Sequence, residues 1–172
     1  MKTVIFIVSL IIIVLIGIYG WKWIRVLTAS SFDEMLAALY KKSVPLIRPK
    51  AIKSLEEYVV LDARSEKEYA VSCLQNAQFI GYESPKLELM DSIAKDQAIL
   101  VYCSVGYRSE RIGEQLQALG FSNVQNLYGG IFEWVNTKHT VVSPNQQPTD
   151  KVHGYSESWG KWVDASVPVV YD

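Results

Sequence analysis

One of the two cysteines of the chain begins the segment best suited to carry chemistry. Residues Ala98–Tyr102 form an apolar run typical of a buried strand, and they lead directly into Cys103-Ser-Val-Gly-Tyr-Arg108. A helix is expected to follow from Ser109 to Leu119 and to end at Gly120. Because open parallel sheets bind ligands at the carboxyl ends of their strands, we expect Cys103 to lie in a ligand-binding loop.

The residue types around Cys103 favour a nucleophilic thiolate. Backbone N–H groups of a short loop, the positive end of a helix and the Arg108 guanidinium all stabilise a negative charge on sulfur. Gly106 permits the tight curvature of such a loop, and Arg108 offers a fork of donors to an anionic substrate. The alternative is a buried structural cysteine beside a surface arginine, but strand, cysteine, glycine-containing loop, arginine and helix in series favour the reactive group.

Elements of alternating type must position this loop. The expected strands are Tyr58–Leu61 (which ends at Asp62), Ala77–Ile80, Ala98–Tyr102 and Val124–Leu127. The expected helical segments are Phe32–Lys42 (behind a Ser31/Glu34 capping box), Lys50–Leu55, Glu66–Val71, Leu87–Ala94, Ser109–Leu119 and Ile131–Val135. Apolar strands separated by helices predict an α/β fold, a parallel sheet covered by helices on both faces.

Composition excludes several other classes of protein. The chain has 172 residues, 49% hydrophobic and 20% charged, with a net charge of −1, which indicates a folded domain rather than a disordered chain. Seventeen basic against eighteen acidic residues argue against nucleic acid as the partner. Two cysteines and two histidines provide neither a disulfide framework nor a metal cluster, so no metal site is predicted.

The N-terminal segment predicts a membrane anchor. Thr3–Trp21 carries no charge, and as a helix it would extend about 28 Å, close to the hydrocarbon thickness of a bilayer. Tyr19, Trp21 and Trp23 then cluster as aromatic residues do at a membrane interface. We therefore expect a transmembrane anchor and interface over residues 1–25 and a linker helix within 26–50. A cleaved signal peptide and a buried helix are the alternatives.

The side of the membrane that carries the domain stays open. Lys22, Arg25, Lys41 and Lys42 follow the apolar run and favour a cytoplasmic domain. The very short segment before the run is instead typical of a signal anchor that exports the domain. The predicted location is thus a single-pass membrane protein of unresolved orientation.

Three motifs resemble those of the rhodanese sulfurtransferases, in the family's order and spacing. They are Val60-Leu-Asp-Ala-Arg64 with Glu68-Tyr69, the loop Tyr102-Cys-Ser-Val-Gly-Tyr-Arg-Ser109, and Leu119-Gly-Phe-Ser-Asn-Val-Gln-Asn-Leu-Tyr-Gly-Gly-Ile131 with Trp134. The resemblance covers Val59 to Trp134, roughly half of the chain. It implies a single rhodanese-like domain over residues 51–136, and residues 137–172 then form a C-terminal extension.

The resemblance implies a two-step transfer of sulfane sulfur. The Cys103 thiolate would take the outer sulfur of a small anionic donor such as thiosulfate as a persulfide and release sulfite, and a thiol, a protein thiol or cyanide would collect it. Binding would fall to the loop residues Ser104, Val105, Gly106, Tyr107, Arg108 and Ser109, with Arg108 on the donor's anionic end. No cofactor is implied. The alternative is a membrane-anchored sulfur carrier or protein-binding module without turnover.

Loop length separates this chemistry from that of related phosphatases and arsenate reductases. Those enzymes place five residues between cysteine and arginine, whereas four separate Cys103 from Arg108. The shorter loop favours sulfur transfer.

Charged residues and a second cysteine near the site have two interpretations each. Asp62, Arg64 and Glu68 are expected to form a structural ion-pair and turn-capping set rather than catalytic groups. Cys73 stands where the family usually has a histidine. It is either a small buried residue or a redox partner that resolves an oxidised Cys103.

The C-terminal extension, residues 137–172, is expected to pack on the domain. Trp159, Trp162 and the apolar Val167–Tyr171 segment are poorly suited to exposure in water. His153 is either a surface residue or an acid or base that approaches the active site.

Overall fold

The computed structural model describes residue 17 and residues 20–171, which belong to two compact units, residues 1–40 and residues 41–172. In the first unit a helical segment at 20–28 precedes α2 (Phe32–Leu39). The Ser31 hydroxyl caps α2 by accepting the Glu34 N–H at 3.2 Å, as the capping box predicts. The helix ends earlier than Lys42, because Tyr40 has an extended backbone and Lys42 has a positive φ of 61°.

The expected membrane span falls almost entirely outside the described residues. Within residue 17 and residues 20–171, no helix combines the length and the apolar character needed to cross a bilayer.

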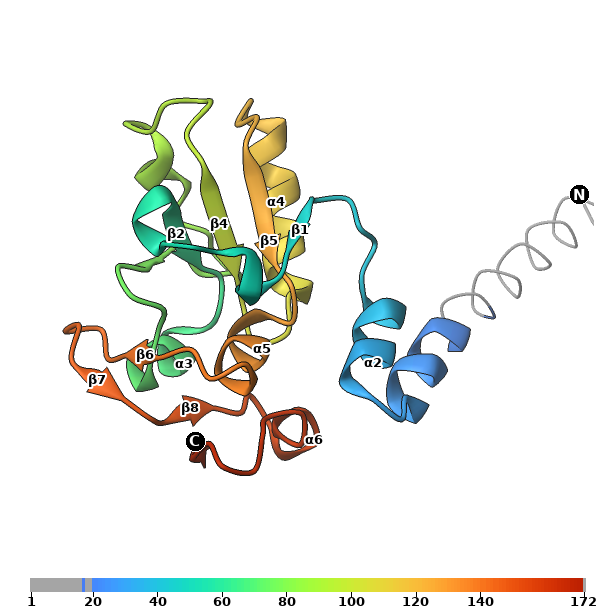
Figure 1. The fold of residues 1–172 in the computed structure, drawn as a ribbon. Coiled ribbons are helices and arrows are strands. Elements are labelled where there is room, and N and C mark those ends of the chain that lie inside the picture. Colours follow the sequence, from blue (N-terminus) through green and yellow to red (C-terminus); the bar gives the residue numbers. More distant parts are fainter. Residues whose placement is uncertain (1–16, 18–19, 172) are drawn as a thin grey trace, which may run out of the picture. The chain divides into compact units, whose positions relative to one another are not determined.

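The second unit is built on a five-stranded parallel sheet with the order β1-β5-β4-β2-β3 (Figure 1). Its strands are β1 (Leu46–Ile47), β2 (Val59–Asp62), β3 (Gln78–Phe79), β4 (Ile99–Tyr102) and β5 (Val124–Leu127). All four neighbouring pairs are parallel, which confirms the predicted α/β class with its parallel sheet. Edge strand β1 was not expected, since Pro45 and Pro49 flank its two residues and break the sequence pattern.

The connecting helices are α3 (Glu66–Val71), α4 (Tyr107–Ala118) and α5 (Gly130–Asn136), with 3₁₀ turns η1 (Pro49–Ala51), η2 (Leu55–Glu57) and η3 (Leu87–Met90). The single helix expected over Lys50–Leu55 is therefore two separate turns. The helix expected over Leu87–Ala94 is one short turn. Helix α4 begins two residues before the expected Ser109, because Gly106 adopts a positive φ of 94° and serves as its N-cap.

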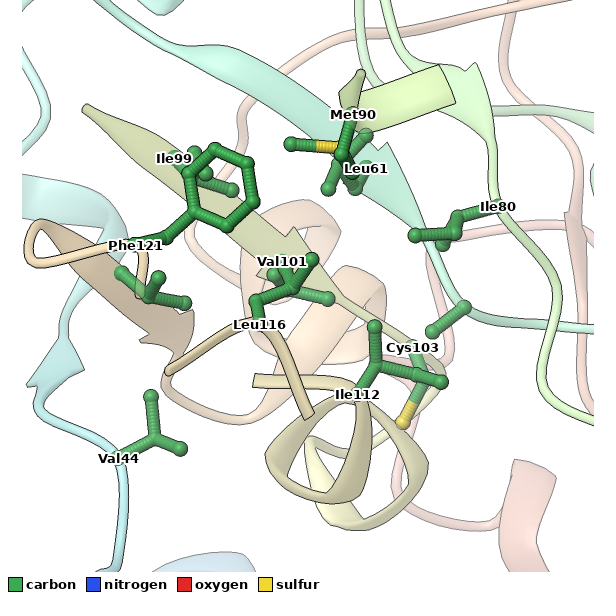
Figure 2. Close-up of a cluster of buried hydrophobic side chains, with 12 residues drawn as sticks. Val44, Leu61, Ile80, Met90, Ile99, Val101, Cys103, Ile112, Leu116 and Phe121 are labelled. Atoms are coloured by element: carbon green, nitrogen blue, oxygen red, sulfur yellow. The ribbon is translucent and has the colours of Figure 1, made fainter. Parts of the chain in front are cut away.

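Hydrophobic side chains cover both faces of the central strand. On one face, Val101 belongs to a buried cluster that includes Ile112 and Leu116 of α4 (Figure 2). On the other face, Leu100 and Tyr102 are also fully buried. Strand β4 is thus buried on both sides, as its unbroken apolar sequence predicts.

The segment after α5 forms short paired strands and one helical turn. Its elements are β6 (Val141–Val142), β7 (Pro148–Thr149), β8 (Val152–His153), α6 (Glu157–Gly160) and β9 (Val169–Val170). Val142 exchanges two backbone hydrogen bonds with Cys73, at 2.7 and 2.9 Å. The Asn136 amide donates to the Trp162 carbonyl at 2.8 Å. Figure 1 shows these elements gathered with α3 and α5 at one end of the sheet.

Candidate active site

Cys103 lies at the carboxyl end of the central strand, in the position that the sequence predicts. Strand β4 ends at Tyr102, and a loop of only four residues, 103–106, leads into α4. Tyr107, Arg108 and Ser109 therefore belong to the first turn of α4 rather than to the loop. The sulfur faces the start of this helix, and the Gly106 N–H donates to Cys103 Sγ at 3.1 Å.

The Cys103 side chain is almost completely enclosed. Its residue is 1% exposed and belongs to the buried cluster on the α4 side of the sheet. Figure 2 shows its sulfur beside Ile112. This apolar surrounding limits the access of water to the sulfur.

The loop backbone is held in shape by α5. The Ile131 N–H donates to the Cys103 carbonyl at 2.9 Å, and the Phe132 N–H donates to the Ser104 carbonyl at 3.2 Å. Gly130 makes this approach possible, because a Cβ there would lie 2.2 Å from the Cys103 carbonyl oxygen and its φ is +57°. The paired glycines of the third sequence motif thus shape the active-site loop.

Asn126 is a site residue that the sequence reasoning missed. Its side-chain amide donates to the Gly106 carbonyl at 2.9 Å and its oxygen accepts the Ser109 hydroxyl at 2.8 Å. It is fully buried in β5. An amide in the interior of a buried strand was the available signal, since buried amides require partners.

Arg108 pairs with Glu68 instead of pointing to an open anion site. Its Nη1 lies 2.7 Å from Glu68 Oε2, and its Nη2 lies 2.7 Å from Oε1 and 2.9 Å from the Ser104 hydroxyl. The Ser104 hydroxyl itself donates to Glu68 at 2.6 Å. A buried carboxylate thus occupies the fork of Arg108 in this structure, and the expectation that Arg108 binds the donor's anionic end stays a prediction.

Glu68 is held as a carboxylate at this junction. Burial opposes its ionisation, but hydrogen bonds and charge from Arg108, with help from Ser104 and Arg64, lower the pKa of Glu68 to about 2. Glu68 also completes a capping box with Ser65 at the start of α3. It therefore joins α3, the loop and α4 through an ion pair and a capping box, the structural role expected for it, with Arg108 as its partner.

Asp62 and Arg64 form a separate ion pair on the opposite face of the sheet. Arg64 Nη2 lies 2.7 Å from Asp62 Oδ2, and both side chains are fully buried. The Tyr102 hydroxyl donates to the same carboxylate at 2.5 Å, and the Arg64 guanidinium also donates to the Ser72 carbonyl. These groups cross-link β2, β4 and the segment after α3. None of the contacts described for them involves the Cys103 sulfur.

Cys73 lies with this second ion pair rather than with Cys103. Burial and the negative charge of Asp62 raise the pKa of the Cys73 thiol, while Arg64 and Tyr69 oppose the rise. The neighbouring Leu74 N–H donates to the Tyr102 hydroxyl at 3.1 Å, on the face opposite to the Cys103 cluster. Both thiols are free. The described contacts thus place the two cysteines on opposite faces of the sheet, and the role of Cys73 as a redox partner, one of its two interpretations, stays a prediction.

The C-terminal segment brings Tyr155 to the site. The Tyr155 ring centroid lies 5.0 Å from Arg108 Cζ. His153, expected as a surface residue or an acid or base, is buried, and its Nδ1 accepts the Tyr155 N–H at 2.9 Å. Among the described residues, no group of three or more His, Cys, Asp or Glu side chains could hold a metal ion.

Comparisons with known proteins agree with this geometry. Residues 49–137 match the family model of the rhodanese-like domain. A tRNA uridine(34) hydroxylase of Cytophaga hutchinsonii is 34% identical over 90 residues, which cover 49% of this chain and 28% of that protein. A sulfurtransferase of Allochromatium vinosum is 29% identical over 89 residues, covering 52% of this chain and 82% of that protein. The chain thus spans only about a third of the length of the hydroxylases that it matches.

Two solved structures share the fold. The rhodanese-like domain from Anabaena aligns with a TM-score of 0.53 at 21% identity, over 58% of this chain and 79% of that one. A thiosulfate sulfurtransferase from Pseudomonas aeruginosa aligns with a TM-score of 0.54 at 19% identity, over 62% of this chain and 22% of that one.

Proposed function

The chain belongs to the family of rhodanese-like domains, and from that premise we propose that it is a sulfurtransferase that carries sulfane sulfur on Cys103. The observation that carries the proposal is the position of the Cys103 sulfur, enclosed at the end of β4 with the Gly106 N–H directed at it at 3.1 Å. A sulfur held in this way is stabilised as an anion at the start of α4. The name of the Allochromatium relative, a sulfurtransferase, supports the same activity.

In the first half-reaction the Cys103 thiolate attacks the outer sulfur of the donor. A new S–S bond forms at Cys103, the bond between the two donor sulfurs breaks, and its electron pair leaves with the donor remainder, which is sulfite when thiosulfate is the donor. In the second half-reaction an acceptor thiolate or cyanide attacks the outer sulfur of the persulfide, and Cys103 leaves as a thiolate. No net oxidation occurs, because each step exchanges one sulfur bond for another.

The surrounding residues keep the loop in the geometry that this exchange needs. The Gly106 N–H and the positive end of α4 offset negative charge on the Cys103 sulfur. The Arg108–Glu68 pair and the α5 backbone fix the loop from two sides. Because these groups are already in place, the free-energy cost of holding a charged sulfur among apolar side chains is lower.

A sulfur carrier or docking module without turnover is the second candidate. The narrow exposure of Cys103 and the pairing of Arg108 with Glu68 favour it, because neither arrangement suits rapid exchange with small anions. The Cytophaga hydroxylase matches over 90 residues, only 28% of its own length, and the net charge of −1 gives no support for a tRNA partner.

We further propose that residues 1–25 attach the domain to a lipid bilayer, with the orientation open. The uncharged Thr3–Trp21 sequence supports this, as does the exposure of Trp21, Trp23 and Leu27 in the described helical segment. Flotation of the full chain with lipid vesicles in a density gradient tests the attachment. Recovery in the aqueous fraction would contradict it.

Sulfur transfer from thiosulfate to cyanide by the full chain in detergent, with intact-mass spectrometry on the same sample, tests the enzyme. Turnover together with a gain of one sulfur atom on Cys103, both absent in Cys103→Ala, is the expected result. A stable adduct without turnover would favour the carrier. If neither appeared with thiosulfate or with organic persulfides, the sulfurtransferase proposal would be wrong.

A further inference from the structure

The helical segment at residues 20–28 and helix α2 form a hairpin within the first unit (Figure 1). The Lys22 ammonium donates to the Leu39 carbonyl at 2.7 Å, at the end of α2 where a positive charge is favourable. Ser30 donates to the Glu34 carboxylate through its N–H and its hydroxyl, at 2.9 and 2.8 Å, and so closes the turn between the two helices. These contacts fix which side of residues 20–28 is turned toward α2.

The side of residues 20–28 turned away from α2 is apolar. Lys22 and the buried Val26 are one turn apart and mark the packed side. With about 3.6 residues per turn, the opposite side is an arc of about 160°. The exposed apolar residues on this arc are Trp23, Leu27, Ile24 and Trp21, in order around the helix. Since Leu27 is 74% exposed and Trp21 65% exposed, this arc has the character of a binding surface.

The order of residues around the arc fits a lipid surface. Trp23 and Trp21 form its two edges, while Ile24 and Leu27 lie between them. Tryptophan is the side chain favoured at the boundary between lipid and water, and aliphatic side chains are favoured deeper in the bilayer. The exposed Arg25 lies next to the Trp21 edge, where a guanidinium can bind headgroup phosphates.

Charge is distributed over the hairpin in the same sense. The charged residues of segment 20–28, Lys22 and Arg25, are both basic, whereas those of α2, Asp33 and Glu34, are both acidic. Because bilayer surfaces are neutral or negative, the basic helix suits contact with headgroups, and the acidic helix suits the side that faces water.

We propose that residues 20–28 lie flat in the headgroup layer of a lipid bilayer, with Ile24 and Leu27 reaching the acyl boundary and α2 on the side of the water. This inference rests on the proposed attachment of residues 1–25 and adds a second contact with the same bilayer. The uncharged Thr3–Trp21 sequence leads directly into the segment, and Leu27 follows Trp21 by six residues, about 9 Å of helix. A bilayer entered by that sequence is therefore within reach of the apolar arc, which favours lipid over a second copy of the chain.

Spin-label depth measurements on the full chain in vesicles test the proposal. The vesicles contain equal amounts of phosphatidylcholine and phosphatidylglycerol, and the label is attached to Leu27→Cys in a background of Cys73→Ala and Cys103→Ala. Ala37→Cys is the matched control, since Ala37 is exposed on the other helix of the hairpin. We expect at least about fivefold fewer collisions with a water-soluble nickel chelate at position 27 than at position 37, because an interfacial helix buries its apolar face by about 5–10 Å.

A label on Arg25→Cys separates a flat helix from an upright one. A flat helix places position 25 nearer to water than position 27, although position 25 is closer to the Thr3–Trp21 sequence. We therefore expect more chelate collisions at position 25 than at position 27, and the reverse order would overturn the proposal.

Two further results would overturn it. One is equal exposure of positions 27 and 37 to the chelate. The other is protection of position 27 with spin–spin broadening that disappears when unlabelled chain is added, because a second copy then covers the arc. If the chain did not float with the vesicles, the proposed attachment would fail as well. A chain that floats with position 27 in water refutes only the flat helix.

Discussion

The guanidinium of Arg108 and the carboxylate of Glu68 meet in a two-point ion pair, with 2.7 Å between both pairs of atoms. The two residues are 40 positions apart in the sequence, and each stands in the first turn of its helix. The pair therefore connects α3 to α4 directly over the loop that begins with Cys103. Its strength matters to the site because Ser104, the residue after the cysteine, bonds to both partners.

Glu68→Gln should destabilise the protein most at neutral pH. The pKa of Glu68 falls from an ordinary 4.5 to about 2 in the folded protein, so the carboxylate contributes stability that is present above pH 4.5. That contribution is lost as pH falls from about 5 toward about 2. We expect a loss of about 3 kcal/mol in free energy of unfolding at pH 7, shrinking toward pH 2. Urea unfolding of both proteins at several pH values measures this loss. A difference in unfolding free energy that does not change with pH would contradict the low pKa of Glu68.

Sequence alone could predict the position of Cys103, because the apolar run and the Gly-containing loop are local signals. It could not predict the partner of Arg108. A fork of donors suits a substrate anion and a buried carboxylate equally, and Glu68 is brought near only when the parallel sheet forms. The capping role expected for Glu68 is confirmed by the Ser65 box, but its second contact depends on the tertiary fold.

Two other features could not be predicted from the sequence, for a physical reason. Strand β1 has only two residues, too few for a strand pattern of their own, and its extended conformation depends on pairing with β5. The sequence around Cys73 does not indicate on which face of the sheet its side chain lies. The structure places it with Asp62 and Arg64, on the other side of the sheet from Cys103.

Gly130→Ala should disrupt the active-site loop. The added Cβ would meet the Cys103 carbonyl at 2.2 Å, and a φ of +57° is unfavourable for alanine. We expect a loss of at least about 3 kcal/mol in unfolding free energy, together with loss of Cys103 persulfidation. Gly120→Ala is the control: its φ is +89° but no atom lies within 4 Å, so it should cost only about 1 kcal/mol. Thermal unfolding compares the two, and equal effects would refute the role of the close approach.

The two cysteines should differ in reactivity toward iodoacetamide in the folded protein. Burial and Asp62 raise the pKa of Cys73, so its thiol stays protonated at neutral pH and alkylates slowly. Cys103 has a backbone donor at its sulfur and should alkylate at least about tenfold faster. Peptide mass spectrometry after timed quenching gives both rates. Cys73→Ala should leave persulfidation of Cys103 unchanged, and preferential alkylation of Cys73 would show that the assignment of the reactive thiol is wrong.

Arg108→Lys separates a positioning role from an anion-binding role. Lysine keeps the positive charge but makes one contact in place of the fork, so the bonds to Glu68 and Ser104 are lost in part. If Arg108 positions the loop, the maximal rate of Cys103 persulfidation should fall by about tenfold for thiosulfate and for an organic persulfide alike. The donor concentration at half-maximal rate should stay constant for both donors, because neither binds to the guanidinium. Single-turnover mass measurements over a range of donor concentrations give the two parameters. A rise in the half-saturating concentration for thiosulfate alone would show that Arg108 binds the anion after all, and that its pairing with Glu68 opens during the reaction.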